Sequence, residues 1–175
     1  MDDAGPSKAR PRTAIIAAAV VLILVGGLAY EIKATAPVRG AVRTCSELLT
    51  IANRPGMKHD ERLATAQRLL AAGDRIIGFL AVEEQHPVGV IMISESASIY
   101  AGGAFGVITE LYVVPEKRSA GVAKLLIDAT AELGRQRSWS RIEVGAPHQP
   151  AWERSLKFYL RNGFVEVGPR LQLLL

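Results

Sequence analysis

The sequence has a single cysteine, Cys45, among its 175 residues. One cysteine cannot form an intramolecular disulfide and cannot supply the ligand set of a structural zinc site. The three histidines, His59, His86 and His148, share no metal-ligand spacing. A metal is therefore not expected, and an unpaired cysteine favours a reducing compartment that faces the cytoplasm.

A concentrated run of basic residues is also missing. The formal net charge is +4, but the lysines and arginines are spread along the chain. Binding to nucleic acid needs a basic patch or stripe, so nucleic acid is not an expected partner. Neither a P-loop, nor a Gly-x-Ser-x-Gly elbow, nor a dinucleotide-binding Gly-x-Gly-x-x-Gly occurs, which argues against the enzyme classes that these motifs mark.

Charge is absent from residues 13–30, TAIIAAAVVLILVGGLAY, which follow Lys8, Arg10 and Arg12. The run lies at the short end of the roughly 17 to 25 residues that a membrane-spanning helix needs. Three interpretations stay open: a single-pass anchor, a secretory signal peptide, and a soluble segment that either packs against the folded domain or reflects an upstream start codon. We divide the chain into a polar basic tail (1–12), a hydrophobic segment that is a candidate transmembrane helix (13–29), and a catalytic domain (30–175).

Beyond the apolar run, helical and strand patterns are interleaved. Apolar residues at three- and four-residue steps predict helices over 38–52, 60–73, 121–135 and 150–162. An alternating pattern predicts a strand over 30–34, and short apolar or β-rich runs predict strands over 75–83, 88–94, 105–114, 141–145, 164–167 and 171–175. The run 105–114, FGVITELYVV, is apolar at nearly every position, which is typical of a central strand covered on both faces. The order predicts an α/β fold with a mixed sheet and helices on both of its faces.

A possible anion site follows that central strand. Pro115 closes the strand, and the small residues Ser119, Ala120, Gly121 and Ala123 open the next helix. Small side chains let a ligand approach the backbone, and the free amides and dipole of a helix N-terminus attract anions. Arg118 adds a guanidinium group suited to phosphate. A plain strand-to-helix connection, with small residues needed only for packing, explains the pattern as well.

Two motifs in register resemble the GNAT superfamily of acyl-CoA-dependent N-acetyltransferases. Residues 118–123, RSAGVA, are similar to its R/Q-x-x-G-x-G/A signature, and 111–115, LYVVP, to its fourth strand. Residues 158–164, FYLRNGF, resemble its F/L-Y-x-x-x-G-F motif. Ser119 stands where the family commonly has glycine, and Trp152 where it often has asparagine. The resemblance covers 30–175 and implies a mixed, mostly antiparallel central sheet flanked by helices on both faces.

The resemblance also implies a site for acetyl-CoA as co-substrate, without a metal. The pantetheine arm is expected along the backbone near Leu111 and Val113. The pyrophosphate is expected on the amides of Arg118, Ser119, Ala120, Gly121, Val122 and Ala123. An amine acceptor would enter from the opposite side of the splayed strands and attack the thioester directly.

Two residues are expected to move protons in this reaction. By the resemblance Tyr159 is the general acid near the thioester sulfur, and its alternative is a packing aromatic. Glu110 is the expected base or the holder of a relay water, because a carboxylate in an apolar strand is costly unless it is paired or functional. Its alternative is an ion pair with a nearby cation.

The predicted function is acetyl transfer from acetyl-CoA to a primary amine on a small molecule or a peptide. The alternatives are a catalytically degenerate acyl-CoA-binding or sensory module, and a membrane-associated structural protein. The catalytic domain would face the cytoplasm, with membrane anchoring through 13–29 left open. Family habit indicates a homodimer, and the apolar ending LQLLL could pair with a partner sheet. No residue diagnostic of the acceptor is present.

Overall fold

The computed structural model describes residues 20–25, 28–34, 58–71, 75–145, 150–168 and 173. Its strands are β1 (Val20–Val25), β2 (Leu28–Ala34), β3 (Ile76–Glu83), β4 (His86–Ser98), β5 (Gly103–Val113) and β6 (Ile142–Val144). Its helices are α2 (His59–Ala71), α3 (Val122–Gln136) and α4 (Glu153–Arg161), with a 3₁₀ turn, η1 (Pro115–Lys117). The elements predicted between residues 60 and 162 are therefore confirmed to within a few residues at each end.

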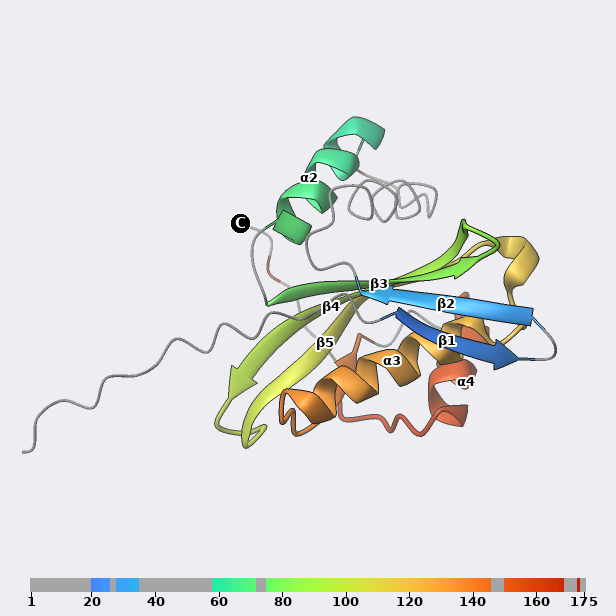
Figure 1. The fold of residues 1–175 in the computed structure, drawn as a ribbon. Coiled ribbons are helices and arrows are strands. Elements are labelled where there is room, and N and C mark those ends of the chain that lie inside the picture. Colours follow the sequence, from blue (N-terminus) through green and yellow to red (C-terminus); the bar gives the residue numbers. More distant parts are fainter. Residues whose placement is uncertain are drawn as a thin grey trace, which may run out of the picture.

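The described strands form one sheet in chain order, from β1 to β6. Each strand from β1 to β4 runs antiparallel to the next, and β6 runs parallel to β5. Helix α2 lies on one face of this sheet, whereas α3 and α4 lie on the other (Figure 1). This arrangement confirms the predicted mixed, mostly antiparallel sheet with helices on both faces.

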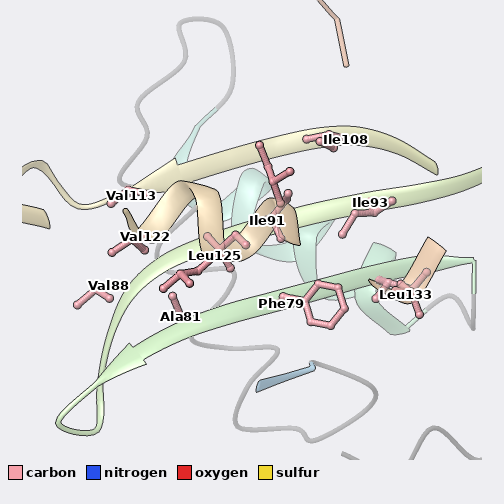
Figure 2. Close-up of a cluster of buried hydrophobic side chains, with 13 residues drawn as sticks. Phe79, Ala81, Val88, Ile91, Ile93, Ile108, Val113, Val122, Leu125 and Leu133 are labelled. Atoms are coloured by element: carbon pink, nitrogen blue, oxygen red, sulfur yellow. The ribbon is translucent and has the colours of Figure 1, made fainter. Parts of the chain in front are cut away.

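Each face of the sheet has its own apolar core. On the α3 face, Ile91 and Ile93 of β4 are fully buried beside Val122 and Leu126 of α3. Figure 2 shows Val122 and Leu125 beside Ile91 in this cluster. A smaller cluster covers the α2 face, with members Leu70, Leu80, Val82, Val90 and Met92. Burial on both faces explains why the central strands are apolar at consecutive positions rather than alternating.

The hydrophobic N-terminal segment departs from the helix that its sequence predicts. Val20–Val25 forms strand β1, which pairs antiparallel with β2 from Val20↔Lys33 to Val25↔Leu28. The physical reason lies in the sequence VVLILV, because four of its six residues are β-branched and β-branched side chains favour strands. Within the described residues no helix has the length and apolarity needed to cross a bilayer.

Other predictions at the two ends have mixed outcomes. The strand predicted over 30–34 is confirmed as part of β2. The strand predicted over 164–167 is wrong, because these residues have no regular secondary structure and leave Val165 and Val167 mostly exposed. β-propensity alone does not make a strand unless a partner strand completes its ladder. The helix predicted over 38–52, residues 1–19, and 171–175 apart from Leu173 lie outside the described residues, and the division of the chain at residues 12 and 29 stays a prediction.

Candidate functional site

Strand β5 changes its neighbours halfway along. Met92 of β4 pairs with Glu110, but the next residue, Ile93, pairs with Ile108, so Thr109 is an extra residue in a β-bulge. The parallel pairing with β6 covers only Gly106 to Ile108. Among the described residues, the part of β5 beyond the bulge therefore pairs with β4 alone. Leu111 and Val113, predicted to run beside the pantetheine arm, lie in this one-sided part.

The bulge also changes the face on which the following side chains lie. Ile108 is buried in the α3-face cluster, and Leu111 packs against that same cluster. Glu110 pairs with Met92, a member of the α2-face cluster, and so lies on the α2 face. The carboxylate that looked costly in an apolar strand therefore does not enter the α3-face core. The Glu110 side chain is half-buried, and Glu110 makes at least one polar or electrostatic interaction with the rest of the protein.

The turn after β5 presents backbone amides. Ser119 and Gly121 both have positive φ, at 67° and 87°, and α3 begins directly after Gly121. The first α-helical hydrogen bond runs from the Leu125 amide to the Gly121 carbonyl at 3.1 Å, so the amides from Val122 to Lys124 precede it. Gly121 is left-handed and directly precedes the right-handed helix α3, and a left-handed residue beside a right-handed one turns neighbouring amides toward one concave surface, which suits an anion.

The charges at the helix starts differ. Helix α2 has Asp60 and Glu61 in its first turn, and α4 has Glu153. The first turn of α3 has no acidic residue, and its N-cap, Gly121, makes no side-chain capping bond. Carboxylates near a helix N-terminus offset the positive end of its dipole, and their absence at α3 leaves that end to an external anion.

The Arg118 side chain folds back onto the end of β5. Its Nε donates a hydrogen bond to the Val113 carbonyl at 3.1 Å, and its guanidinium carbon lies 5.8 Å from the centroid of the Tyr112 ring. The sequence suggested only a charge for phosphate, and no motif indicates this contact with the strand. Arg118 therefore joins the predicted anion turn to the one-sided part of β5.

A second link to the turn escaped sequence reasoning. Lys117 in η1 forms a salt bridge of 2.5 Å with Glu83 at the end of β3. The Glu83 side chain is only 12% exposed, and its Oε1 is buried without a hydrogen-bond partner. An acidic residue ending an otherwise apolar strand was the available signal. The ion pair holds the start of the turn against the β3–β4 hairpin.

Tyr159 lies on α4 in an aromatic group. Its ring meets Phe158 and Phe164 edge to face, with centroid separations of 5.5 and 5.3 Å, and packs against the α3-face cluster. Burial raises the pKa of the Tyr159 phenol above its ordinary value. The hydroxyl thus stays protonated at neutral pH, as a general acid requires. Tyr159 and Glu110 belong to opposite faces of the sheet.

The other half of β5 is closed by Trp139. The Trp139 Nε1 and the Arg137 Nη1 donate to the same Glu95 Oε2, at 2.7 and 3.0 Å. A Cβ added at Gly106 would lie 2.3 Å from Trp139 Cζ3, so the indole occupies the space that a side chain would need. These contacts hold β5, β4 and the end of α3 together where β6 pairs.

The predicted binding residues lie together at the end of β5 and in the turn after it. The two predicted proton-transfer residues lie on opposite faces of the sheet, Glu110 on the α2 face and Tyr159 on the α3 face. The turn, the one-sided part of β5 and Glu110 are consecutive in sequence, whereas Tyr159 comes from α4. No group of three His, Cys, Asp or Glu side chains within the described ranges is placed to hold a metal ion. Cys45 and His148 lie outside those ranges.

Known proteins share this fold. The model of the Acetyltransferase (GNAT) family matches residues 44–164. No curated protein matches the sequence. A ribosomal-protein-alanine N-acetyltransferase from Brucella melitensis biovar Abortus 2308 has 23% identity and a TM-score of 0.66, covering 83% of this chain and 99% of its own. An aminoglycoside N-acetyltransferase solved with CoA has 20% identity and a TM-score of 0.69, covering 87% and 98%. At these identities the solved structures support the fold alone.

Proposed function

Because the chain belongs to the acetyltransferase (GNAT) family, we propose that it transfers an acetyl group from acetyl-CoA to a primary amine. The observation that carries the proposal is the one-sided end of β5, which leads through η1 into an amide-lined turn. An open strand edge suits the amide-bearing pantetheine arm, and the turn suits a pyrophosphate.

The donor site comprises two groups of backbone atoms. The edge at Leu111 and Val113 would hydrogen-bond the pantetheine arm. In the turn, the amides of Arg118 and Ala120 already donate to the carbonyls of Pro115 and Lys117, at 3.2 and 3.4 Å. The pyrophosphate would therefore be held by the amides of Ser119 and of Gly121 to Ala123. The fit is supported by the positive φ of Ser119 and Gly121 and by the acid-free first turn of α3. Bound acetyl-CoA would supply an activated thioester. A solved structure similar to this chain contains CoA.

The acceptor amine would approach from the α2 face, where Glu110 lies. An ammonium ion cannot attack, so Glu110, directly or through a water, would accept the proton that makes the amine nucleophilic. The new C–N bond forms as the C–S bond breaks, without an acyl-enzyme. Tyr159, which is neutral at pH 7 because even its ordinary pKa is about 10 and burial raises that pKa further, would give its proton to the departing CoA thiolate.

Two acceptor classes are compatible with the proposal. The solved relatives include an enzyme named for a ribosomal-protein alanine and others named for aminoglycosides. Both supply a primary amine, and we propose a small-molecule or peptide amine as the acceptor here. The catalytic face would meet these substrates in the cytoplasm, where acyl-CoA is available.

The testing experiment is calorimetric titration of the full-length chain with acetyl-CoA, with free CoA and desulfo-CoA as comparisons. We expect saturable binding of all three, because they share the pantetheine and pyrophosphate groups. Thiol release in the presence of an amine panel then reports turnover. Binding without turnover on any amine would favour the degenerate acyl-CoA-binding module, and no binding by a folded sample would refute the donor site.

A further inference from the structure

Thr109 is the residue on which the two halves of β5 depend. In a regular strand, residues two apart lie on the same face. Without the bulge, Glu110 would therefore lie on the face of Ile108, which is buried in the α3-face cluster. The inserted Thr109 shifts the alternation by one, so that Glu110 lies with Met92 on the other face while Leu111 returns to the face of Ile108. One residue thus determines where the only carboxylate of β5 lies.

A bulge interrupts the ladder and leaves backbone groups that need other partners. The Thr109 hydroxyl donates a hydrogen bond to the Met92 carbonyl at 3.3 Å. Met92 is almost fully buried, so this hydrogen bond to its carbonyl competes little with water and is stronger than it would be at the surface. The contact therefore favours the bulged register over a regular one, in which the donor would lie elsewhere.

We infer that Thr109 is a positioning residue for the acetyl transfer: its hydroxyl holds the bulge that sets Glu110 on the acceptor face and ends the pairing of β5 with β6. The inference rests on the proposed function for its kinetic consequence only. The structural consequence, a bulge held by one side-chain hydrogen bond, is independent of any substrate.

The test compares Thr109→Val, which keeps the branched shape and loses the hydroxyl, with Thr109→Ser, which keeps the hydroxyl. The matched control is Thr130→Val, because Thr130 also donates its hydroxyl to a backbone carbonyl, that of Leu126 at 2.9 Å, but within α3. For each protein we would measure kcat, the acetyl-CoA Kd by calorimetry, thermal unfolding, and the backbone amide NMR signals of Met92, Glu110 and Leu111.

Thr109→Val should lower kcat about fivefold to tenfold, the effect of one lost hydrogen bond, with the acetyl-CoA Kd changed by less than about twofold. Thr109→Ser should restore kcat, and Thr130→Val should lower the unfolding temperature without lowering kcat. This separation distinguishes positioning from a general loss of stability. Thr109→Val should also shift the Glu110 and Leu111 amide signals.

A wild-type kcat in Thr109→Val would overturn the inference. If the wild-type chain binds no acetyl-CoA or acetylates no amine, the proposed function fails. The amide NMR signals alone then show whether the Thr109 hydroxyl holds the bulge. Unchanged Glu110 and Leu111 signals in Thr109→Val then overturn the inference, and shifted signals support it. If Thr109→Val does not fold, Thr109→Ala provides the same comparison against the Ser variant.

Discussion

The two halves of β5 differ in what lies beside them. From Gly106 to Ile108 the strand pairs with β4 on one side and β6 on the other, and Trp139 fills the space above Gly106. Beyond Thr109 it pairs, among the residues that the structure describes, with β4 alone, and it leads into the turn at Arg118. We call these the closed half and the open half.

The difference shows how one strand provides both a scaffold and a binding edge. The closed half places its backbone groups in ladders and its side chains in a core, so it contributes mainly to stability. The open half gives up one ladder, which is costly unless water or a ligand completes it. Substitutions in the closed half should therefore change unfolding first, and those around the open half should change binding or turnover first.

The largest effect is expected in the closed half, from Gly106→Ala. The new Cβ would lie 2.3 Å from Trp139 Cζ3 and 2.7 Å from Cε3, so the indole or the strand must move. Overpacking of this kind costs up to about 3 kcal/mol, and we expect a loss of that size in the free energy of unfolding. Chemical denaturation monitored by tryptophan fluorescence measures it.

Gly134→Ala is the matched control, because its Cβ would meet the same indole at 3.1 Å, a contact that needs a shift of only a few tenths of an ångström. Alanine also has the better helix propensity, by about 1 kcal/mol. This variant should stay within about 1 kcal/mol of wild type. Equal stability of the two variants would contradict the placement of the indole over Gly106.

The next largest effect is expected at Tyr159 of α4, which packs against the same α3-face cluster as Leu111 of the open half. Tyr159→Phe keeps the ring contacts with Phe158 and Phe164 and removes the proton, so kcat should fall about a hundredfold. The acetyl-CoA Kd should stay within about twofold of wild type. Steady-state kinetics with calorimetry separates the two quantities, and an unchanged kcat would leave Tyr159 as a packing residue.

The pH dependence follows from the direction of the Tyr159 pKa, which burial raises. Below the ordinary tyrosine pKa, about 10, the phenol is neutral in both the folded and the unfolded chain. As pH rises further the unfolded phenol ionises first, so the folded state loses stability up to the raised pKa. Unfolding measured above pH 10 should show this loss in wild type and less of it in Tyr159→Phe.

A smaller effect on binding is expected from Gly121→Glu at the turn. The glutamate must adopt φ near 87°, and its carboxylate would compete for the amides that a pyrophosphate would use. We expect the acetyl-CoA Kd to rise about tenfold or more, equivalent to about 1.4 kcal/mol. Gly102→Glu is the control, because Gly102 has φ 72° with open space around it, in the turn before β5. An equal loss of affinity in both variants would contradict the anion site.

The closed and open halves were not equally predictable from sequence. The apolar run 105–114 indicated a covered central strand, because burial on both faces imposes a local pattern. The bulge at Thr109 has no such pattern, since it is defined by pairing with Met92 and Ile93, residues far away in the chain. The sequence singled out Glu110 because it is a charged residue in an otherwise apolar strand, but it did not indicate on which face of the sheet Glu110 lies.

The N-terminal strand shows the same limit. The run VVLILV fits a buried helix or a buried strand, since apolar periodicity cannot separate the two. Pairing with β2 decides for the strand. The turn at Arg118 was predictable as an anion site because small residues at a helix start are a local signal. The bonds of Arg118 to Val113 and of Lys117 to Glu83 were not, because each joins separate elements.

The smallest effect is expected from Ser119→Gly, which tests whether the turn that follows the open half retains backbone strain. Ser119 holds φ 67°, a conformation that costs a residue with a Cβ about 1 kcal/mol, and glycine removes that cost while adding freedom to the unfolded chain. Ser138→Gly, at φ 57° just after α3, relieves the same strain far from the turn. Both variants should gain less than about 1 kcal/mol in unfolding free energy.

Only Ser119→Gly should lower the acetyl-CoA Kd, about twofold, because removing its Cβ eases approach to the amides. A weaker affinity in Ser119→Gly would mean instead that the serine hydroxyl itself contacts the ligand.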